Sequence, residues 1–159
     1  MSCIILDIDN CISDDGWRIP FINMETNELH ARFHEYHMLS AFDVPANLQN
    51  IVCDADDILI FTARPSEYRA ITDEWLRRRA GITPRLLIMR ARLEHAPSLE
   101  LKRRMLRAVL RDTDIAVGDI VAAYDDREDI VRMYLDHGVP GRVLKCHDIP
   151  YPTQKGKSK

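Results

Sequence analysis

The stretch that decides the fold is Ile4-Ile5-Leu6-Asp7-Ile8-Asp9-Asn10-Cys11-Ile12. It begins with a short run of aliphatic and β-branched residues and ends in turn-forming Asp and Asn, which is typical of a buried β-strand rather than of a helix. Asp7 and Asp9 lie two positions apart at its carboxyl end, so both side chains can reach one centre. Such a pair repels unless a cation lies between them. The alternative is that these acidic residues merely end a strand in solvent, and this stretch alone does not decide between the two.

Apolar runs of strand length alternate with helical periodicity along the rest of the chain. Strands are predicted over residues 57–62, 85–89, 120–124 and 142–146. The helices between them are predicted to start at Pro65-Ser66, to span residues 98–111 and to end before Gly138. Alternating strands and helices predict an α/β fold with a parallel sheet of about five strands and right-handed crossovers. The 159 residues suit one domain of this kind, covering residues 1–159.

Composition narrows the class of protein. With 46% hydrophobic and 30% charged residues, and no apolar run near the ~20 that cross a bilayer, the chain is expected to be water-soluble and to have no membrane partner. Its start shows no secretory signal pattern, and its four cysteines have no CxxC spacing, so we expect a cytoplasmic protein with reduced thiols. The net charge of −3 provides no general attraction to a polyanion. The basic tail, residues 151–159, is expected to be disordered.

Residues 13–50 form a long insert between the first two strands, and we expect it to be a small cap. Within it, the apolar spacing predicts a helix over residues 27–42. His30, His34 and His37 share one face of that helix. A zinc site is one interpretation, but a fourth ligand is not obvious, so contact with a substrate is favoured.

Polar residues follow several of the predicted strands. Because the carboxyl ends of parallel strands meet at one edge of a sheet, residues that are far apart in sequence are predicted to converge there. They are Asp7, Asp9, Thr62, Arg64, Asp125 and Asp126. Four carboxylates at one edge need a divalent cation, and that cation, Lys102 and Arg64 would then surround an anion. The anion that suits this set is a phosphate.

The segments Asp7-Ile8-Asp9, Thr62, Lys102 and Asp125-Asp126 resemble, in order, the four motifs of the haloacid dehalogenase (HAD) superfamily of phosphotransferases. The resemblance implies a three-layer Rossmann-like fold with a cap insert after the first strand. The resemblance implies that Asp7 is the nucleophile that forms an aspartyl-phosphate and that Asp9 is the general acid/base. It implies that Thr62 and Lys102 hold the phosphate. It also implies that a Mg²⁺ ion is bound by Asp7, Asp9, Asp125 and Asp126, the last of these directly or through water.

Within that superfamily, the chain looks most similar to the 3′-phosphatase domain of phage polynucleotide kinase, through Thr62-x-Arg64, Tyr68-Arg69 with Trp75, and Asp125-Asp126-Arg127. This likeness implies that Arg64, Arg127 and one of Arg90 or Arg92 contact the substrate or organise the site. The chain departs from the family where Asn10-Cys11 replaces the usual Gly-Thr. It also has no phosphate-binding loop of a kinase, so the kinase activity is not implied.

The leading hypothesis is therefore a magnesium-dependent phosphomonoesterase that acts on a (deoxy)nucleoside monophosphate. Four residues of the insert are predicted to select the substrate: Trp17, Arg18, Arg32 and His34. A 3′-phosphatase acting on polynucleotide ends is the alternative, although such a substrate would normally need a basic groove. A non-catalytic phosphate-binding or partner-binding module is more remote, because Asp7 and Asp9 are both present. The sequence does not indicate the oligomeric state.

Overall fold

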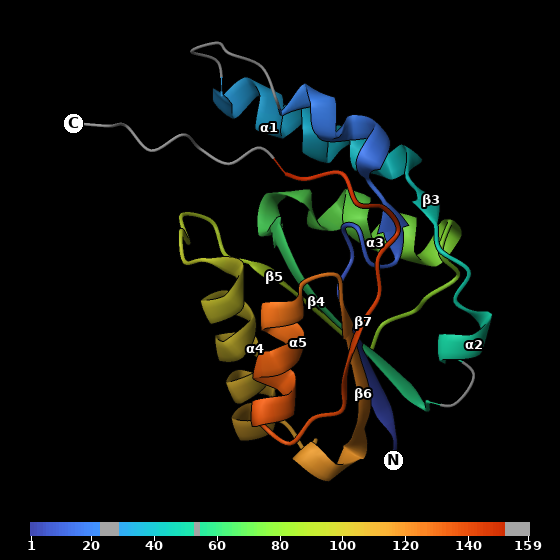
Figure 1. Ribbon diagram of the computed structural model, residues 1–159, viewed down its shortest axis with the longest axis vertical. Coiled ribbons are helices and arrows are strands. Elements are labelled where there is room, and N and C mark those ends of the chain that lie inside the picture. Colours follow the sequence, from blue (N-terminus) through green and yellow to red (C-terminus); the bar gives the residue numbers. More distant parts are fainter. Residues whose placement is uncertain (23–28, 53–54, 152–159) are drawn as a thin grey trace.

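The structure, a computed structural model, describes residues 1–22, 29–52 and 55–151. For residues 29–32 it describes the backbone but not the side chains. Its centre is a five-stranded parallel sheet in the order β5-β4-β1-β6-β7 (Figure 1). The strands are β1 (Cys3–Leu6), β4 (Asp57–Pro65), β5 (Leu86–Arg90), β6 (Ile120–Asp125) and β7 (Gly141–Val143). The predicted α/β fold with a parallel sheet is confirmed.

Helices cover both faces of the sheet because its central strands are apolar on both sides. Helices α4 (Ser98–Asp112) and α5 (Glu128–Asp136) lie on one face, where Ile5 joins their core cluster. Helix α3 (Arg69–Arg78), preceded by the 3₁₀ turn η3 (Ser66–Tyr68), lies on the other face, where Leu6 packs in the cluster that contains Trp75. Strand β1 is therefore buried on both faces, which explains its uninterrupted apolar sequence. The 3₁₀ turn η4 (Val117–Asp119) leads into β6.

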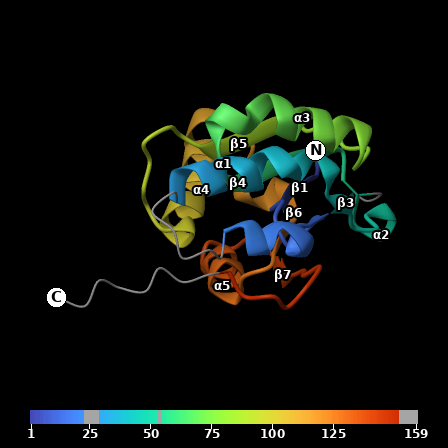
Figure 2. The ribbon, with the colours of Figure 1, turned by 90° about the horizontal axis from the view of Figure 1, so that it is seen from above.

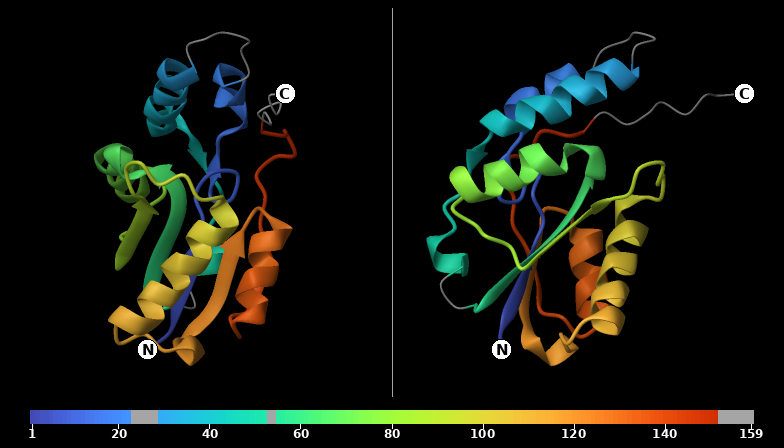
Figure 3. Two further views of the ribbon diagram at one scale, coloured as in Figure 1. Left: turned by 90° about the vertical axis from the view of Figure 1, so that its left-hand side faces the viewer. Right: turned by 180° about the vertical axis from the view of Figure 1, so that it is seen from behind.

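Most of the described insert after β1 lies over the carboxyl ends of the strands, whereas its last helix lies lower, beside the sheet (Figure 1). The insert contains β2 (Ser13–Asp14), the 3₁₀ helix η1 (Gly16–Phe21), α1 (Leu29–Met38), η2 (Leu39–Phe42), β3 (Val44–Pro45) and α2 (Gln49–Val52). Strands β2 and β3 pair antiparallel in a small second sheet. Figures 2 and 3 show η1 and α1 side by side above the strand ends. This placement agrees with a cap, although the helix predicted over residues 27–42 is α1 followed by η2, and residues 23–28 lie outside the described part.

The last strand is shorter than predicted. A strand was expected over residues 142–146, but β7 ends at Val143. The chain then turns away from the sheet, and the backbone N–H of Cys146 donates to the carbonyl of Asn10 at 3.0 Å. Residues 144–151 continue upward to the insert (Figure 1). None of the described helices is long and apolar enough to cross a membrane.

Candidate active site

Four buried polar side chains lie at the carboxyl edge of the sheet, below the insert. Asp7 follows β1, Thr62 belongs to β4, Asp125 ends β6, and Lys102 reaches the same point from α4. Their exposed fractions are at most 6%. Strand direction brings them together, because the ends of three neighbouring parallel strands meet at one edge.

Lys102 is held between two of the carboxylates. Its Nζ atom lies 2.7 Å from Asp7 Oδ1 and 2.5 Å from Asp125 Oδ2. Burial alone would lower the pKa of Lys102, but Asp7 and Asp125 outweigh burial and raise it, so the ammonium stays charged. Lys102 therefore fixes the orientation of Asp7 while neutralising only one of the carboxylates around it.

Asp7, Asp125 and Asp126 form an acidic cluster. Each has an oxygen atom within 4.8 Å of the others. Burial, followed by the charges of neighbouring carboxylates, raises the pKa of Asp7 well above its usual value and that of Asp126 to about 6. A raised pKa means that these groups hold a proton more readily, and a divalent cation bound among their oxygen atoms, which are the ligands that hard cations prefer, would keep them ionised. The cluster therefore fits a cation such as Mg²⁺.

Asp9 does not belong to that cluster, since its carboxylate is bound by two arginines. Arg18 Nη2 and Arg64 Nη2 each lie 2.6 Å from Asp9 Oδ1. Burial alone would raise the pKa of Asp9, but Arg64 and Arg18 outweigh burial and hold it well below its usual value. Asp9 is therefore an ionised carboxylate outside the acidic cluster, and its place among the ligands of a cation stays a prediction.

The two arginines are interior residues. Arg18 is 0% exposed and donates to both oxygens of Asp43, at 2.8 and 2.7 Å, as well as to Asp9. Arg64 is 1% exposed and lies 3.5 Å from Asp43 Oδ2. Because Arg18 is buried among these acceptors and does not line the cavity described below, the structure does not support its predicted contact with a polar edge or the phosphate of the substrate.

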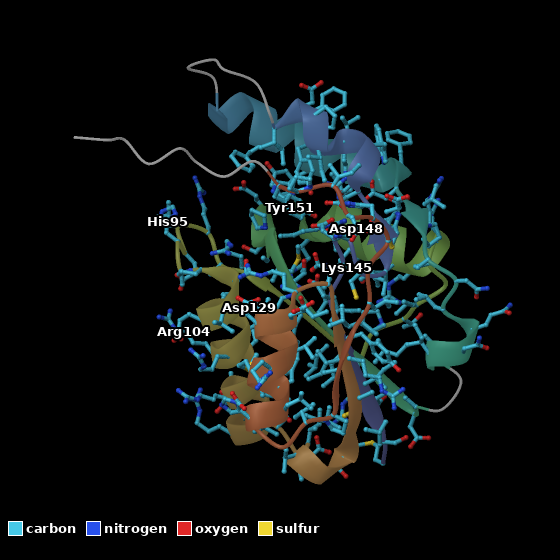
Figure 4. All side chains as sticks on the ribbon, viewed as in Figure 1. His95, Arg104, Asp129, Lys145, Asp148 and Tyr151 are labelled. Carbon is cyan, nitrogen blue, oxygen red and sulfur yellow. The ribbon has the colours of Figure 1, made fainter. Side chains whose placement is uncertain are left out.

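A cavity of about 920 Å³ opens above Asp7, Asp9, Thr62 and Lys102. One wall is aromatic and comes from the insert and from η3. There His34 Nδ1 lies 2.9 Å from Tyr68 Oη, and the His37 ring stacks on Tyr68 with centroids 4.7 Å apart. The loop after β5 forms another part of the lining and carries Arg92 and His95; Figure 4 labels His95 there. The cavity thus joins a charged floor to an aromatic wall, which suits a phosphate ester with a flat organic group.

Comparison with solved structures gives the fold a name. A haloacid dehalogenase-like hydrolase from Streptococcus pneumoniae superposes with a TM-score of 0.57 at 8% identity, covering 89% of this chain and 83% of that one. The fold is haloacid dehalogenase-like. Two chains from structures of the Pnkp1/Rnl/Hen1 RNA repair complex superpose with TM-scores of 0.61 and 0.63 at 17% identity, covering 92% and 93% of this chain. This chain spans 43% and 46% of their length. Neither a family model nor a curated protein matches the sequence.

The HAD-like fold places the other predicted substrate residues in different settings. Arg92 and His34 line the cavity, and so does Arg127, which is also paired with Asp129 at 2.6 Å. Arg90 lines it too, but its guanidinium donates to the carbonyl oxygens of Ala63, Glu94 and Ala96 and so shapes the loop after β5.

The remaining two predicted contacts belong to the insert. Trp17 lies outside the residues that line the cavity; it is 45% exposed and its Nε1–H donates to Asp43 Oδ1 at 3.0 Å. Arg32 belongs to α1, but its side chain is outside the described residues, as is that of His30.

Sequence reasoning missed three residues of the site. Tyr68 was named as part of a resemblance and was given no role in the site, although its ring and hydroxyl form part of the cavity wall. Asp43 follows an apolar segment with no motif around it, so nothing in the sequence indicated its pairing with Arg18. Tyr151 was assigned to a disordered tail, but it lines the cavity and its hydroxyl donates to Asp15. Residues 152–159 of that tail are outside the described part.

Proposed function

We propose that this protein is a magnesium-dependent phosphomonoesterase that hydrolyses a nucleotide phosphate, with a nucleoside monophosphate as its substrate. One observation carries the proposal: the Asp7 carboxylate lies against Lys102, at 2.7 Å, beside Asp125 and Asp126 on the floor of the cavity. A carboxylate that is buried, oriented and open to a cavity is suited to attack a bound phosphorus atom.

In the proposed reaction, Asp7 attacks the phosphorus and the ester bond to the leaving oxygen breaks, which gives an aspartyl-phosphate and an alkoxide that takes up a proton. Lys102 holds Oδ1 of Asp7, which leaves Oδ2 as the attacking atom. The Thr62 hydroxyl and the Lys102 ammonium would hold phosphoryl oxygens. Water then attacks the phosphorus, releasing phosphate and regenerating the Asp7 carboxylate.

A Mg²⁺ ion held by Asp7, Asp125 and Asp126 would neutralise negative charge on the phosphoryl oxygens. Lys102 lies on the same carboxylates, so it keeps Asp7 and Asp125 at a fixed separation before substrate binds. Asn10 Nδ2 donates to Asp126 Oδ2 at 3.2 Å and orients the third ligand.

Arg18 and Arg64 keep Asp9 ionised, but a carboxylate whose pKa is held so low is a weak base, so Asp9 would take a proton from the attacking water only after this pairing loosens. For Asp9 also to protonate the leaving oxygen, as the superfamily resemblance implies, these two arginines must first move away from its carboxylate. Asp9 would then donate a proton to the leaving oxygen in the first step and regain a proton from the attacking water in the second.

The aromatic wall supports a nucleoside as the leaving group. Tyr68 and Phe33 line the cavity, and stacking of a base on an aromatic side chain is worth ~1–3 kcal/mol. Arg92, in the loop after β5, lines the cavity, is exposed and would contact polar edges of the base or the sugar.

A 3′-phosphorylated polynucleotide end is the second candidate. Two similar structures come from an RNA repair complex. A second cavity of about 410 Å³, lined by Lys145 and His147, also shares Arg127 with the first cavity, so a chain could continue beyond one nucleotide.

The test is release of phosphate, with Mg²⁺ and with excess chelator, from nucleoside 5′- and 3′-monophosphates, 3′-phosphorylated oligonucleotides and a small aryl phosphate. We expect metal-dependent release, with the highest kcat/KM on a mononucleotide. Asp136→Asn, an exposed carboxylate at the far end of α5, is the matched control for Asp7→Asn. Preference for the oligonucleotides would favour the second candidate, and absence of release from every ester would leave the non-catalytic phosphate-binding module.

A further inference from the structure

The segment from Lys145 to Tyr151, which we call the strap, runs from the end of β7 to the insert (Figure 1). Figure 4 labels Lys145, Asp148 and Tyr151 along it. It has no regular secondary structure, and it has no part in the reaction proposed above. Its side chains and backbone nevertheless contact two buried polar residues, Asn10 of the catalytic loop and Asp15 of the insert.

Asn10 is the first attachment point. Its backbone is left-handed, with φ 57°, a conformation that Asn tolerates better than most residues. The backbone N–H of His147 donates to Asn10 Oδ1 at 2.8 Å, and the N–H of Cys146 donates to the Asn10 carbonyl at 3.0 Å. Because the other end of the same amide group donates to Asp126, Asn10 joins the strap to the acidic cluster. The Asn that replaces the family's usual Gly thus gains contacts that glycine cannot make.

Asp15 is the second attachment point. It is 0% exposed, and three side chains from two other segments converge on it. Tyr36 of α1 donates from its hydroxyl at 2.5 Å, His147 Nε2 lies 2.5 Å away, and the Tyr151 hydroxyl also donates to it. A buried carboxylate needs such partners to offset its desolvation, so removing two of them loosens its hold on the strap and the insert.

Gly16 allows the His147 ring to reach Asp15. A Cβ atom at Gly16 would lie 3.0 Å from Cδ2 of His147, closer than ordinary packing permits. The turn at the start of the insert is thus shaped to receive a side chain from the strap.

Contacts continue from Asp15 to the catalytic floor. Tyr36, which donates to Asp15, accepts a hydrogen bond on its carbonyl from Arg18 at 3.0 Å, and its ring lies 4.0 Å below the Arg18 guanidinium. Arg18 in turn binds Asp9. Tyr151 also lines the substrate cavity directly.

We infer that the strap holds the insert closed over the cavity, and that His147 and Tyr151 are positioning residues that determine how tightly a nucleotide binds. The inference rests on the proposed function for its substrate, but the closure itself does not depend on activity. A small aryl phosphate needs only the floor of the cavity, where Lys102 holds Asp7 and Asp125 without any contact from the strap. A nucleotide also needs the aromatic wall, which the insert shares with Tyr68 of η3.

The test uses the full chain with His147→Ala and Tyr151→Phe combined, which removes both strap contacts to Asp15 and keeps the Tyr151 ring in the wall. Tyr124→Phe is the matched control, because it removes a hydroxyl whose partner is Arg142, away from Asp15. Hydrogen exchange by mass spectrometry should show faster exchange over residues 13–22 and 33–45 in the double variant but not in the control. KM for the nucleotide should rise roughly tenfold with kcat little changed, while kcat/KM for the aryl phosphate should stay within about twofold of wild type.

Unchanged exchange in the insert would overturn the inference, even if the protein proved to have no phosphatase activity. An equal loss on both esters would also overturn it, since the strap would then support the whole fold rather than nucleotide binding. If the double variant does not fold, Tyr151→Phe alone, which loses one hydroxyl, should show the same changes to a smaller degree, and wild-type behaviour in that variant would count against the strap.

Discussion

Replacing Arg18 with methionine is expected to destabilise the protein strongly. The Arg18 side chain is 0% exposed and binds Asp43 and Asp9, with Nη2 at 2.7 and 2.6 Å from their oxygens. Methionine keeps much of the apolar stem but removes the charge, so these carboxylates lose a buried partner. Breaking a buried ion pair in this way costs about 3–5 kcal/mol.

The measurement is equilibrium unfolding in urea, together with thermal unfolding. For a chain of this size, the expected loss corresponds to a fall in Tm of roughly 6–20 °C. Arg78→Met is the matched control, because the Arg78 side chain is 79% exposed and its pair with Glu74 lies in solvent. The control should change the unfolding free energy by less than about 0.5 kcal/mol. Adding Asp43→Asn to Arg18→Met should recover part of the loss, since one uncompensated charge is removed.

The opposite pattern would refute this reasoning. If Arg18→Met unfolded like wild type but raised KM for a nucleotide, Arg18 would be the substrate contact predicted from sequence. The buried network around Asp9 would then be an incorrect description of the site.

Three further predictions concern the metal cluster, pH and the cavity wall. Mg²⁺ at about a hundred times its Kd should stabilise the wild type against thermal unfolding by about 2.7 kcal/mol, and Asp126→Asn should lose most of that stabilisation. Equal stabilisation of both proteins would exclude Asp126 as a ligand. Burial lowers the pKa of His37 to about 4, below its unfolded value of about 6.5, so the unfolded chain binds more protons between these two pH values. The contribution of His37 to the free energy of unfolding should therefore fall by about 1–3 kcal/mol as the pH drops through this interval. The free energy of unfolding in urea should depend less steeply on pH in His37→Phe than in the wild type, and an equal dependence would contradict the assignment. Tyr68→Ala should lower kcat/KM for a nucleotide roughly ten- to a hundredfold and leave an aryl phosphate nearly unaffected in steady-state assays, whereas Trp17→Ala should not discriminate between the two esters; the reverse result would return base stacking to Trp17.

The fold was predictable because its signals are local and repeated. Strand β1 is buried on both faces, so its sequence is a continuous apolar run, and the polar residue after each central strand marks the carboxyl edge of the sheet. Parallel topology then brings Asp7, Thr62 and Asp125 together without any knowledge of side-chain contacts, which is why these residues could be named from the sequence.

The orientation of Asp9 and the position of Arg18 were not predictable in that way. Asp9 shares the Asp-x-Asp spacing with Asp7, but its direction is set by arginines from η1 and β4 that compete with any cation for its carboxylate. Arg18 lies in a mixed polar and aromatic stretch that is typical of a surface. Its burial depends on Asp43, 25 residues further along the chain, and no periodic pattern encodes such a pairing.

The path of the strap could not be predicted from the sequence for a related reason. Residues 142–146 have the composition of a strand, and β7 does form over Gly141–Val143. The strand ends because Cys146 and His147 direct their backbone N–H groups to Asn10 rather than along the sheet. A hydrogen bond to a side chain more than 130 residues away overrides the local strand preference.

The most direct test of the proposed function is detection of phosphate on Asp7. The protein would be mixed with substrate and Mg²⁺, quenched in acid within milliseconds to seconds, and mapped by peptide mass spectrometry, with Asp7→Asn as the control. The mechanism predicts a transient acyl-phosphate on the peptide that carries Asp7, absent from the variant, which should have no turnover because an amide cannot form that intermediate. Asp7→Asn with near-normal turnover, or a phosphoryl group found on a different residue, would contradict it.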